Sequence, residues 1–445
     1  MSHTEKSCEI LTPQHMYRVD ELCGIAESTL IESAGLAVAE EIVRRYGARR
    51  TVVLCGPGNN GRDGAAAARH LMAWGWPVEI SDDVRDAELI IDALYGAGLN
   101  RDFPQSLADK INNAAVPVIS VDVPSGLDGL TGQPRGSCVK AELTITFFRK
   151  KPAHVLQPGR ALCGEVVVLD IGIMNSVLES IAPTLWENSK PVLPAFKTDG
   201  HKFSRGHAAV ISGGKFNTGA SRLAARAALK CGAGLVTLVG SDEALAVQAA
   251  HVTAVMLAEF KILHDPRITA ICIGPAAGVN DQTRKHVEAI LAAQASVVLD
   301  ADALTSCAKK PQELFDWIQK NLSRQVVMTP HEGEFQRLFG NLEGSKIDRA
   351  LTAARSSGVI IILKGPDTVI AHPDGRATVN TNAPPSLASA GAGDVLAGIL
   401  TGLLAQKMEA YAAACAAVWL HGNAANLHGP HGLTAESLLE YVMQP

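Results

Sequence analysis

The chain has 445 residues, of which 47% are hydrophobic, 19% are charged and 40 are glycine. This length and composition predict two globular domains, each able to bury its own core, and exclude a disordered or fibrous chain. The net charge of −5 supplies no basic field. We therefore expect no nucleic acid or membrane partner and favour chemistry on small molecules.

Neither export nor a membrane span is expected from this sequence. The longest uncharged apolar runs, at 395–405 and 410–420, are about half the ~20 residues that cross a bilayer. The first residues contain no apolar segment of the kind that directs secretion. We therefore expect a cytoplasmic protein whose nine scattered cysteines are reduced.

The first half begins with helices and then a strand that leads into a glycine-rich loop. Pro13 opens a short helix, and apolar residues along 27–46 recur at helical spacing. The apolar run Thr51–Cys55 predicts a buried strand, and the loop 56–64 joins it to an alanine-rich helix. Strand, glycine loop and helix form a phosphate-binding layout, although an ordinary glycine turn explains the same residues equally well.

Two further strands, at 88–92 and 117–122, each end in an acidic residue beside a glycine-containing loop. Because ligands of open α/β sheets bind at the carboxyl ends of strands, we expect the polar side chains there to converge. Their oxygens would suit a hard cation, while the alternative is that each acid caps the next turn. The converging residues are Asn60, Asp92, Asp122 and Ser125.

A proline-containing segment without apolar periodicity, 184–206, separates the two halves. We therefore predict domains at 1–190 and 195–445. Strands and helices alternate again in the second half, which predicts another parallel sheet. Its expected strands lie at 208–212, 235–239, 270–273, 296–299, 325–328 and 359–363.

The loops that follow these strands carry polar and glycine residues. Lys364 lies at the end of a buried strand beside glycine, where it is either a surface charge or the neutraliser of a diphosphate. His331 with Glu332 and Glu334 is a tempting zinc set, but no further ligand is spaced to complete it. The other glycine loops of this half lie at 213–220 and 274–278, and an acidic turn lies at 300–304.

The stretch 380–406 is the centre of the second half. A polar loop passes through Gly391-Ala392-Gly393-Asp394 into an apolar helix. The glycines leave room for backbone amides to converge on a phosphate, and the helix directs its positive end at the same place. Asp394 is therefore either a helix cap or a catalytic group.

This glycine-aspartate turn resembles the active-site signature of the ribokinase-like superfamily. More closely, nearly the whole chain is similar to the bifunctional NAD(P)H-hydrate repair enzymes, which join an NAD(P)HX epimerase to an ADP-dependent NAD(P)HX dehydratase. The resemblance implies an α/β protein with two three-layer αβα domains. The first would be a Rossmann-like epimerase domain and the second a ribokinase-like dehydratase domain.

Four segments of the first half match epimerase signatures in order: GPGNNGRDG, IIDALYGAGL, VDVPSGLDGLTG and FFRKKPAHVLQPGRALCGEVVVLDIGI. The resemblance implies that Asp122 is the acid–base residue and that Asn60, Asp92 and Ser125 bind K⁺. Two departures are Arg62, where the family has a second glycine, and a shortened connection at 76–88. The implied substrate-binding residues are Asn59, Asn60, Gly61, Arg62, Asp63, Gly96, Ala97, Gly98, Leu99, Asn100, Arg101, Asp102 and Asp122.

In the second half, the resemblance makes Asp394 the base toward the substrate hydroxyl, with Mg²⁺ and ADP as the other participants. The departures are Ala276-Ala277 in place of Gly-Leu and a rewritten loop at 382–385. Residues that would face NAD(P)HX are Ala220, Gly278, His331 and Asp394. Residues that would bind the adenine nucleotide are Lys364, Gly365, Pro366, Asp367, Thr368 and Gly393.

The implied function is repair of hydrated NADH and NADPH. One half would interconvert the R and S hydrates, and the other would remove water from the S form while ADP gives AMP and phosphate. The alternative is a ribokinase-like kinase of a vitamin precursor or sugar, fused to a non-catalytic binding or dimerisation domain. We also expect a homo-oligomer.

Overall fold

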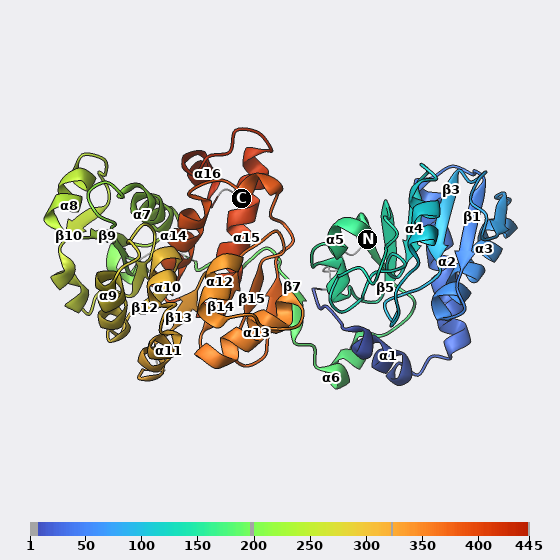
Figure 1. The fold of residues 1–445 in the computed structure, drawn as a ribbon, viewed down its shortest axis with the longest axis horizontal. Helices are drawn as coiled ribbons and strands as arrows, with labels where there is room; N and C mark the ends of the chain where they lie inside the picture. Colours follow the sequence, from blue (N-terminus) through green and yellow to red (C-terminus); the bar gives the residue numbers. More distant parts are fainter. Residues whose placement is uncertain (1–7, 196–199, 322–323, 444–445) are drawn as a thin grey trace. The chain divides into compact units, whose positions relative to one another are not determined.

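The computed structural model describes residues 8–195, 200–321 and 324–443. The chain divides into two compact units, Met1–Glu187 and Asn188–Pro445, which Figure 1 shows in blue to green and in green to red. The division falls a few residues before the predicted domain boundary. Each unit is an α/β body built on a largely parallel sheet.

The first unit is built on a parallel sheet with the strand order β2-β1-β3-β4-β5-β6. The short strand β2 lies inside the connection at 76–88, where it forms one edge of the sheet. The three strands expected from the sequence are β1, β3 and β4. The bounds are β1 Thr51–Cys55, β2 Val78–Ile80, β3 Leu89–Ala93, β4 Val118–Val121, β5 Leu143–Phe147 and β6 Glu165–Leu169.

Helices cover both faces of this sheet because every second residue of a strand points to the same face. Val53 and Ile91 pack in one hydrophobic cluster with α2 and α3, whereas Val52 and Ile90 pack in another with α4. The helices are α1 Pro13–Leu22, α2 Glu27–Arg45, α3 Asn59–Ala73, α4 Gln105–Asn112, α5 Gly159–Cys163 and α6 Leu178–Ile181, and the short strand β7 Leu185–Glu187 ends the unit.

The sheet of the second unit has the order β10-β9-β8-β11-β12-β13-β14-β15-β16. It is parallel as far as β14 and then antiparallel through β15 and β16. The expected parallel strands are present, but the two antiparallel strands were not anticipated. The bounds are β8 His207–Ile211, β9 Leu235–Val239, β10 Met256–Ala258, β11 Ala270–Ile273, β12 Ser296–Leu299, β13 Val326–Met328, β14 Ile360–Leu363, β15 Val369–Ala371 and β16 Ala377–Val379.

Two layers of helices enclose the second sheet (Figure 1). The apolar helix α14 is almost wholly buried and packs on α7, where Gly398 and Gly402 lie directly against the backbone of Ala224 and Ala228. The predicted three-layer α/β class is therefore confirmed. One layer contains α7 Gly219–Lys230, α14 Ala392–Ala405, α15 Ala410–His428 and α16 Ala435–Tyr441. The remaining helices are α8 Asp242–Ala249, α9 Asp281–Leu291, α10 Ala301–Cys307, α11 Pro311–Gln319, α12 Glu332–Phe339 and α13 Lys346–Ser357.

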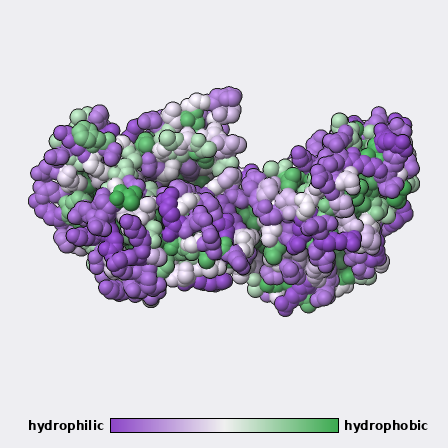
Figure 2. All heavy atoms as spheres, viewed as in Figure 1, coloured by the Kyte–Doolittle hydropathy of each residue, from purple (hydrophilic) through white to green (hydrophobic). Residues whose placement is uncertain are grey.

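The surface in view is predominantly hydrophilic, with hydrophobic residues scattered among polar ones (Figure 2). In the described part of the chain, no single helix is long and apolar enough to cross a membrane. The pair α1 and α2 meets that length and composition only when the two helices are joined across a bend of 118°.

Two candidate active sites

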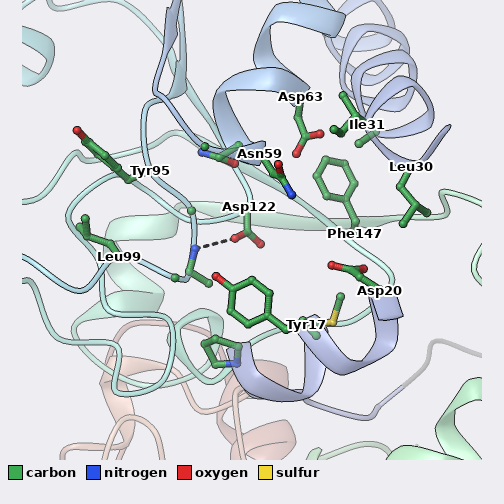
Figure 3. A pocket seen from close by; sticks show the side chains of 18 of the residues that line it. Tyr17, Asp20, Leu30, Ile31, Asn59, Asp63, Tyr95, Leu99, Asp122 and Phe147 are labelled. Carbon is green, nitrogen blue, oxygen red and sulfur yellow. Dashed lines mark hydrogen bonds between the residues drawn. The ribbon is translucent and has the colours of Figure 1, made fainter. Parts of the chain in front are cut away.

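The first unit contains a cavity of about 720 Å³ at the carboxyl ends of its strands. Figure 3 shows Asn59, Asp63 and Asp122 on its wall, together with Tyr17 and Asp20 from α1. The predicted residues that line it are Asn59, Asn60, Asp63, Gly96, Ala97, Gly98, Leu99, Asn100, Arg101 and Asp122. The sequence argument missed the contribution of α1.

Asp122 follows β4 with a φ of 67°, in the left-handed region that a non-glycine residue seldom adopts. Its carboxylate accepts hydrogen bonds from the amide of Ala97, at 2.8 Å, and from Thr146, at 3.2 Å, and it pairs with the Lys151 ammonium at 2.8 Å. Burial raises the pKa of Asp122, but the Lys151 charge and the hydrogen bonds outweigh it and lower the pKa to about 2. Asp122 is therefore an ionised carboxylate at neutral pH.

His154 fixes the backbone around Asp122 and Lys151. Its Nδ1 accepts the amide hydrogen of Lys151 at 2.9 Å, so the hydrogen is on Nε2, which donates to the Asp122 carbonyl at 2.8 Å. Burial and then the Lys151 charge lower the pKa of His154 to about 4, so the imidazole is neutral. Lys151, Thr146 and His154 were missed as site residues, although all three belong to the segment FFRKKPAH or immediately precede it.

Asp63 and Asp20 also face the cavity, and both hold their protons more tightly than usual. Burial, and then the negative charge of Asp122, raise the pKa of Asp63 to about 8. Burial in the cavity mouth raises the pKa of Asp20 to about 6, against the opposing effect of Lys151. One cavity therefore combines an ionised carboxylate with a carboxylic acid that remains protonated at neutral pH.

Of the predicted potassium ligands, Asn60 lines the cavity, whereas Asp92 and Ser125 are not among the residues that line it. Asp92 is fully buried and accepts hydrogen bonds from Ser125, at 2.6 and 2.9 Å, and from Ser120, at 2.9 Å. Both amide atoms of Asn60 are buried without a hydrogen-bond partner among the described residues. An amide oxygen that receives no hydrogen bond fits a hard cation. Within the described ranges no cluster of three His, Cys, Asp or Glu residues suits a metal, which is compatible with an amide-containing set.

Three of the predicted substrate residues lie outside the cavity wall. Gly61 is buried against the backbone of Gly56, and Asp102 is exposed. Arg62 is exposed and pairs with Glu27 at 3.1 Å, and it also donates to the side chain of Asn59 at 3.0 Å. The unusual arginine therefore leaves the cavity open, because it turns toward α2.

In the second unit, Lys364 follows β14 and points toward the start of α14, where a Cβ at Gly393 would lie 3.6 Å from its Nζ. Its ammonium pairs with the buried Asp300 at 2.9 Å and lies 3.9 Å from Glu334. Burial lowers the pKa of Lys364, but the facing carboxylates raise it above its usual value. Lys364 is therefore a held cation, and its role as the neutraliser of a diphosphate stays a prediction.

Asp394 is the third residue of α14, after Gly391, whose φ is 83°. No described residue makes a hydrogen bond to its half-buried carboxylate. Burial, and then the charge of Asp300, raise the pKa of Asp394 to about 6, while Lys364 acts in the opposite direction. A carboxylate with this pKa is ionised at neutral pH and still basic enough to accept a proton.

The loop that begins at Lys364 is held by its own side chains and by Lys346. Gly365 donates its amide to the Thr368 hydroxyl at 3.1 Å, which donates back to the Gly365 carbonyl at 2.8 Å. Lys346 pairs with Asp367 at 2.7 Å and lies 3.5 Å from the Lys364 carbonyl. Pro366 completes this loop. Lys346 was missed because it lies on α13, eighteen residues before Lys364.

The remaining predicted residues lie at loop ends of the same unit. His331 caps α12, since its Nδ1 accepts the amides of Gly333 and Glu334 at 3.0 and 3.2 Å, and its side chain is half exposed. Gly278 donates its amide to Asp302 at 2.8 Å. Ala220 is in the first turn of α7, which also contributes Leu223 against Gly391.

These features define a two-unit α/β protein with a polar site at the carboxyl ends of each parallel sheet. The model of the NAD(P)H-hydrate dehydratase family matches residues 208–443, and that of the YjeF-related protein N-terminus matches 27–85 and 77–153. The bifunctional NAD(P)H-hydrate repair enzyme of Moorella thermoacetica is 31% identical over 97% of this chain and 96% of its own length. That of Salinibacter ruber is 33% identical over 96% and 93%.

The chain therefore belongs to the family of bifunctional NAD(P)H-hydrate repair enzymes. A ribokinase-like superfamily protein from Enterococcus faecalis is 25% identical and covers 56% of this chain and 90% of its own, with a TM-score of 0.50. The two resemblances inferred from the sequence are confirmed, and membership of the repair family disfavours the vitamin or sugar kinase.

Proposed function

We propose that this chain repairs hydrated NADH and NADPH with two separate active sites. The first unit interconverts the R and S hydrates, and the second dehydrates the S form while ADP gives AMP and phosphate. The observation that carries this proposal is the pairing of each matched family segment with its own polar site, around Asp122 and Asp394. The dehydratase alone would leave the R hydrate unrepaired.

In the second unit, Asp394 accepts the proton of the substrate hydroxyl as it attacks the nucleotide phosphate. Its pKa of about 6 suits a base at neutral pH. Lys364 and the amides around Gly391 and Gly393 stabilise the negative charge on the phosphates at the positive end of α14. The phosphorylated hydroxyl is then a good leaving group, whereas a free hydroxyl is a poor one.

Magnesium fits this site as a companion of the nucleotide. No cluster of three acidic or histidine ligands occurs among the described residues, and Mg²⁺ typically binds through substrate phosphates, water and one or two carboxylates. Asp300 and Asp302 would supply those carboxylates. Bound there, the ion would neutralise phosphate charge.

In the first unit, Asp122 is the acid–base residue and the residues on the cavity wall bind the hydrated nucleotide. Asn60, Asp92 and Ser125 would hold potassium, which would compensate the negative charge of Asp92, whose pKa burial raises. The cytoplasmic location and the homo-oligomer stay predictions.

The two domains, at 1–190 and 195–445, would work independently because each has its own sheet and its own site. Separate expression tests this. Soluble halves that epimerise and dehydrate on their own are expected. Two halves that are inactive alone, beside an active full chain, would contradict independence.

The function is tested with a mixture of R and S NADH hydrates, by following the recovery of reduced-nicotinamide absorbance. With ADP the full chain should recover all of the hydrate, and ATP in place of ADP tests nucleotide choice. Asp122→Asn should recover only the S fraction at the original rate. No recovery by the full chain with either nucleotide would overturn the proposal.

A further inference from the structure

Two carboxyl groups of the first unit face the same cavity from different elements, Asp63 from α3 and Asp122 from the end of β4 (Figure 3). Asp122 is fully engaged by Lys151, Ala97 and Thr146. No described residue makes a hydrogen bond to the Asp63 carboxyl group, which is half-buried on the cavity wall. A partnerless carboxyl group aimed into a ligand cavity is available to the ligand.

Inversion of the hydrate requires two catalytic groups, a proton acceptor and a proton donor. Water adds to an enamine double bond at the carbon next to nitrogen, so the hydroxyl of hydrated NADH lies on the ring carbon bonded to the ring nitrogen. Inverting that carbon by opening and closing the ring requires one group to remove the hydroxyl proton. It also requires a second group to give a proton to the departing nitrogen.

We propose that Asp63 is a catalytic residue of the first unit, the proton donor that works opposite Asp122. The inference rests on the proposed epimerase function and deepens it. Asp122 takes the hydroxyl proton, and the freed electron pair forms the carbonyl. The bond from carbon to nitrogen breaks, its electron pair goes to nitrogen, and nitrogen takes the proton of Asp63.

The open aldehyde then rotates and presents its other face. Nitrogen attacks the carbonyl carbon and returns its proton to Asp63, while the carbonyl oxygen takes back the proton that Asp122 holds. Both carboxyl groups end in the state in which they began, and no oxidant, reductant or second substrate is consumed. The only change is the configuration of one carbon.

The groups around Asp63 agree with this division of roles. The charged groups that act on it are Asp122, Arg62, Asp20 and Lys151, and burial together with Asp122 raises its pKa to about 8. Lys151 already donates to Asp122 and Thr146. Asp20, with a pKa of about 6, is mostly ionised at neutral pH, which makes it a poorer proton donor. When the environments of two carboxyl groups push their pKa values apart, the group with the higher pKa serves as the acid and the group with the lower pKa as the base.

The experiment uses full-length Asp63→Asn, with Asp109→Asn as a control for an exposed surface aspartate of the same unit. Interconversion of purified R and S NADPH hydrates is followed by chromatography. Thermal unfolding of the first unit shows whether the variant is folded, and ADP-dependent dehydration of the S hydrate is the control for the second unit. We expect kcat for interconversion to fall by about 10² to 10⁴ with little change in KM. Asp109→Asn should match the wild type.

The pH profile separates catalysis from simple binding. The acid form of Asp63 is required, so wild-type interconversion should fall as pH rises through about 8. Asp63→Asn should lose that alkaline limb. A variant with wild-type kcat, a defect confined to KM, or a loss that instead follows Asp20→Asn would overturn the inference while the proposed function stands. A wild-type chain that never interconverts the hydrates would overturn both.

Discussion

The two units place an aspartate and a lysine at the carboxyl ends of parallel strands, but they connect them differently. In the first unit the lysine pairs directly with the proposed catalytic aspartate, since Lys151 lies 2.8 Å from Asp122. In the second unit Lys364 lies 2.9 Å from Asp300 instead, which leaves Asp394 without a direct partner. The pKa of Asp122 is lowered to about 2, whereas that of Asp394 is raised to about 6.

This difference shows how the pairing of the lysine affects the pKa of the proposed catalytic aspartate. A direct pair lowers that pKa in the first unit, whereas the lysine of the second unit pairs with another aspartate. Asp394 combines the ionised state with a useful basicity, so in the proposed mechanism it serves alone as the base. Asp122 is held as an anion, which leaves its cavity in need of a separate proton donor. The same two residue types therefore support two divisions of proton transfer in one chain.

The largest effect is expected from Asp394→Asn. Asp394 lies in the first turn of α14 and makes no capping hydrogen bond, so asparagine removes only its interaction with the helix dipole and the free energy of unfolding should change by about 0.3–1 kcal/mol. It cannot accept a proton, so the rate of ADP-dependent dehydration should fall by about 10² to 10⁴. Interconversion of the R and S hydrates in the same preparation is the internal control. Near-normal dehydration would exclude Asp394 as the base and return that role to another residue, with His331 the first candidate.

The next effect is expected from Lys151→Met, which leaves the Asp122 carboxylate in its protein environment without a cation. Breaking a buried ion pair from one side commonly costs about 3–5 kcal/mol. Thermal unfolding should show a destabilised first unit, and interconversion should be lost while dehydration continues. Lys364→Met is the matched comparison in the second unit. Equal stability of Lys151→Met and the wild type would show that the ion pair does not set the state of Asp122.

The pH profiles of the two reactions should separate on the acid side. Asp394 must be ionised, and its pKa is about 6, so dehydration is fully active above that value and falls about tenfold for each pH unit below it. Asp122 stays ionised down to about pH 2, so interconversion should not share this limb. Rates measured between pH 5 and 7 with both substrates decide the point. If both rates fell in parallel with decreasing pH, the difference in pKa between Asp394 and Asp122 would not control the two reactions.

A smaller effect is expected on the cation requirement of the first unit. Asn60→Ala removes an amide that has no hydrogen-bond partner among the described residues, so the fold should be preserved. Potassium should stimulate interconversion by the wild type several-fold and should have no effect on the variant. Dehydration is measured in the same buffers with and without potassium. If the wild type interconverts the hydrates equally fast without potassium, potassium has no role in this reaction.

The smallest effect is expected from Lys346→Met in the second unit. Lys346 holds the loop of Lys364 through Asp367, so its loss should raise the KM for ADP a few-fold and leave kcat nearly unchanged. Lys346→Arg keeps the charge and should restore much of the affinity. A change in kcat with an unchanged KM would exclude the positioning role.

The sequence predicts most of the parallel strands because they are buried and rich in apolar residues, as in the continuous run Ile360–Leu363. It does not predict β5, β6 or β10. It does not predict β15 and β16, which are only three residues each and continue the sheet in the antiparallel direction. Such short apolar runs carry no periodic signal. The edge strand β2 was hidden in the shortened connection for the same reason.

The sequence also directs attention to polar residues on loops after strands, and the structure places one of them, Asp122, on the cavity wall. The roles of Asp122 and Asp394 stay predictions. The sequence misses residues that reach a site from elsewhere, such as Asp20 on α1 and Lys346 on α13. Their approach depends on how helices pack, and no spacing in the chain records that distance. The sequence also does not predict the direction of the Arg62 side chain, because its partner Glu27 lies on another helix.

The close contact of α14 with α7 has a consequence for how the second site tolerates change. Gly398 and Gly402 lie one and two turns beyond Asp394 and touch the backbone of Ala224 and Ala228. A single methyl group at Gly398 would push α14 away from α7. Because Asp394 lies at the start of the same helix, its carboxylate would move as well. Misalignment of about 1 Å at a reacting group can lower a rate about 10²-fold. The packing of α14 on α7 therefore sets the position of Asp394. A substitution in the interior of α14, remote from the substrate, should lower the proposed dehydration rate and leave interconversion in the first unit unchanged.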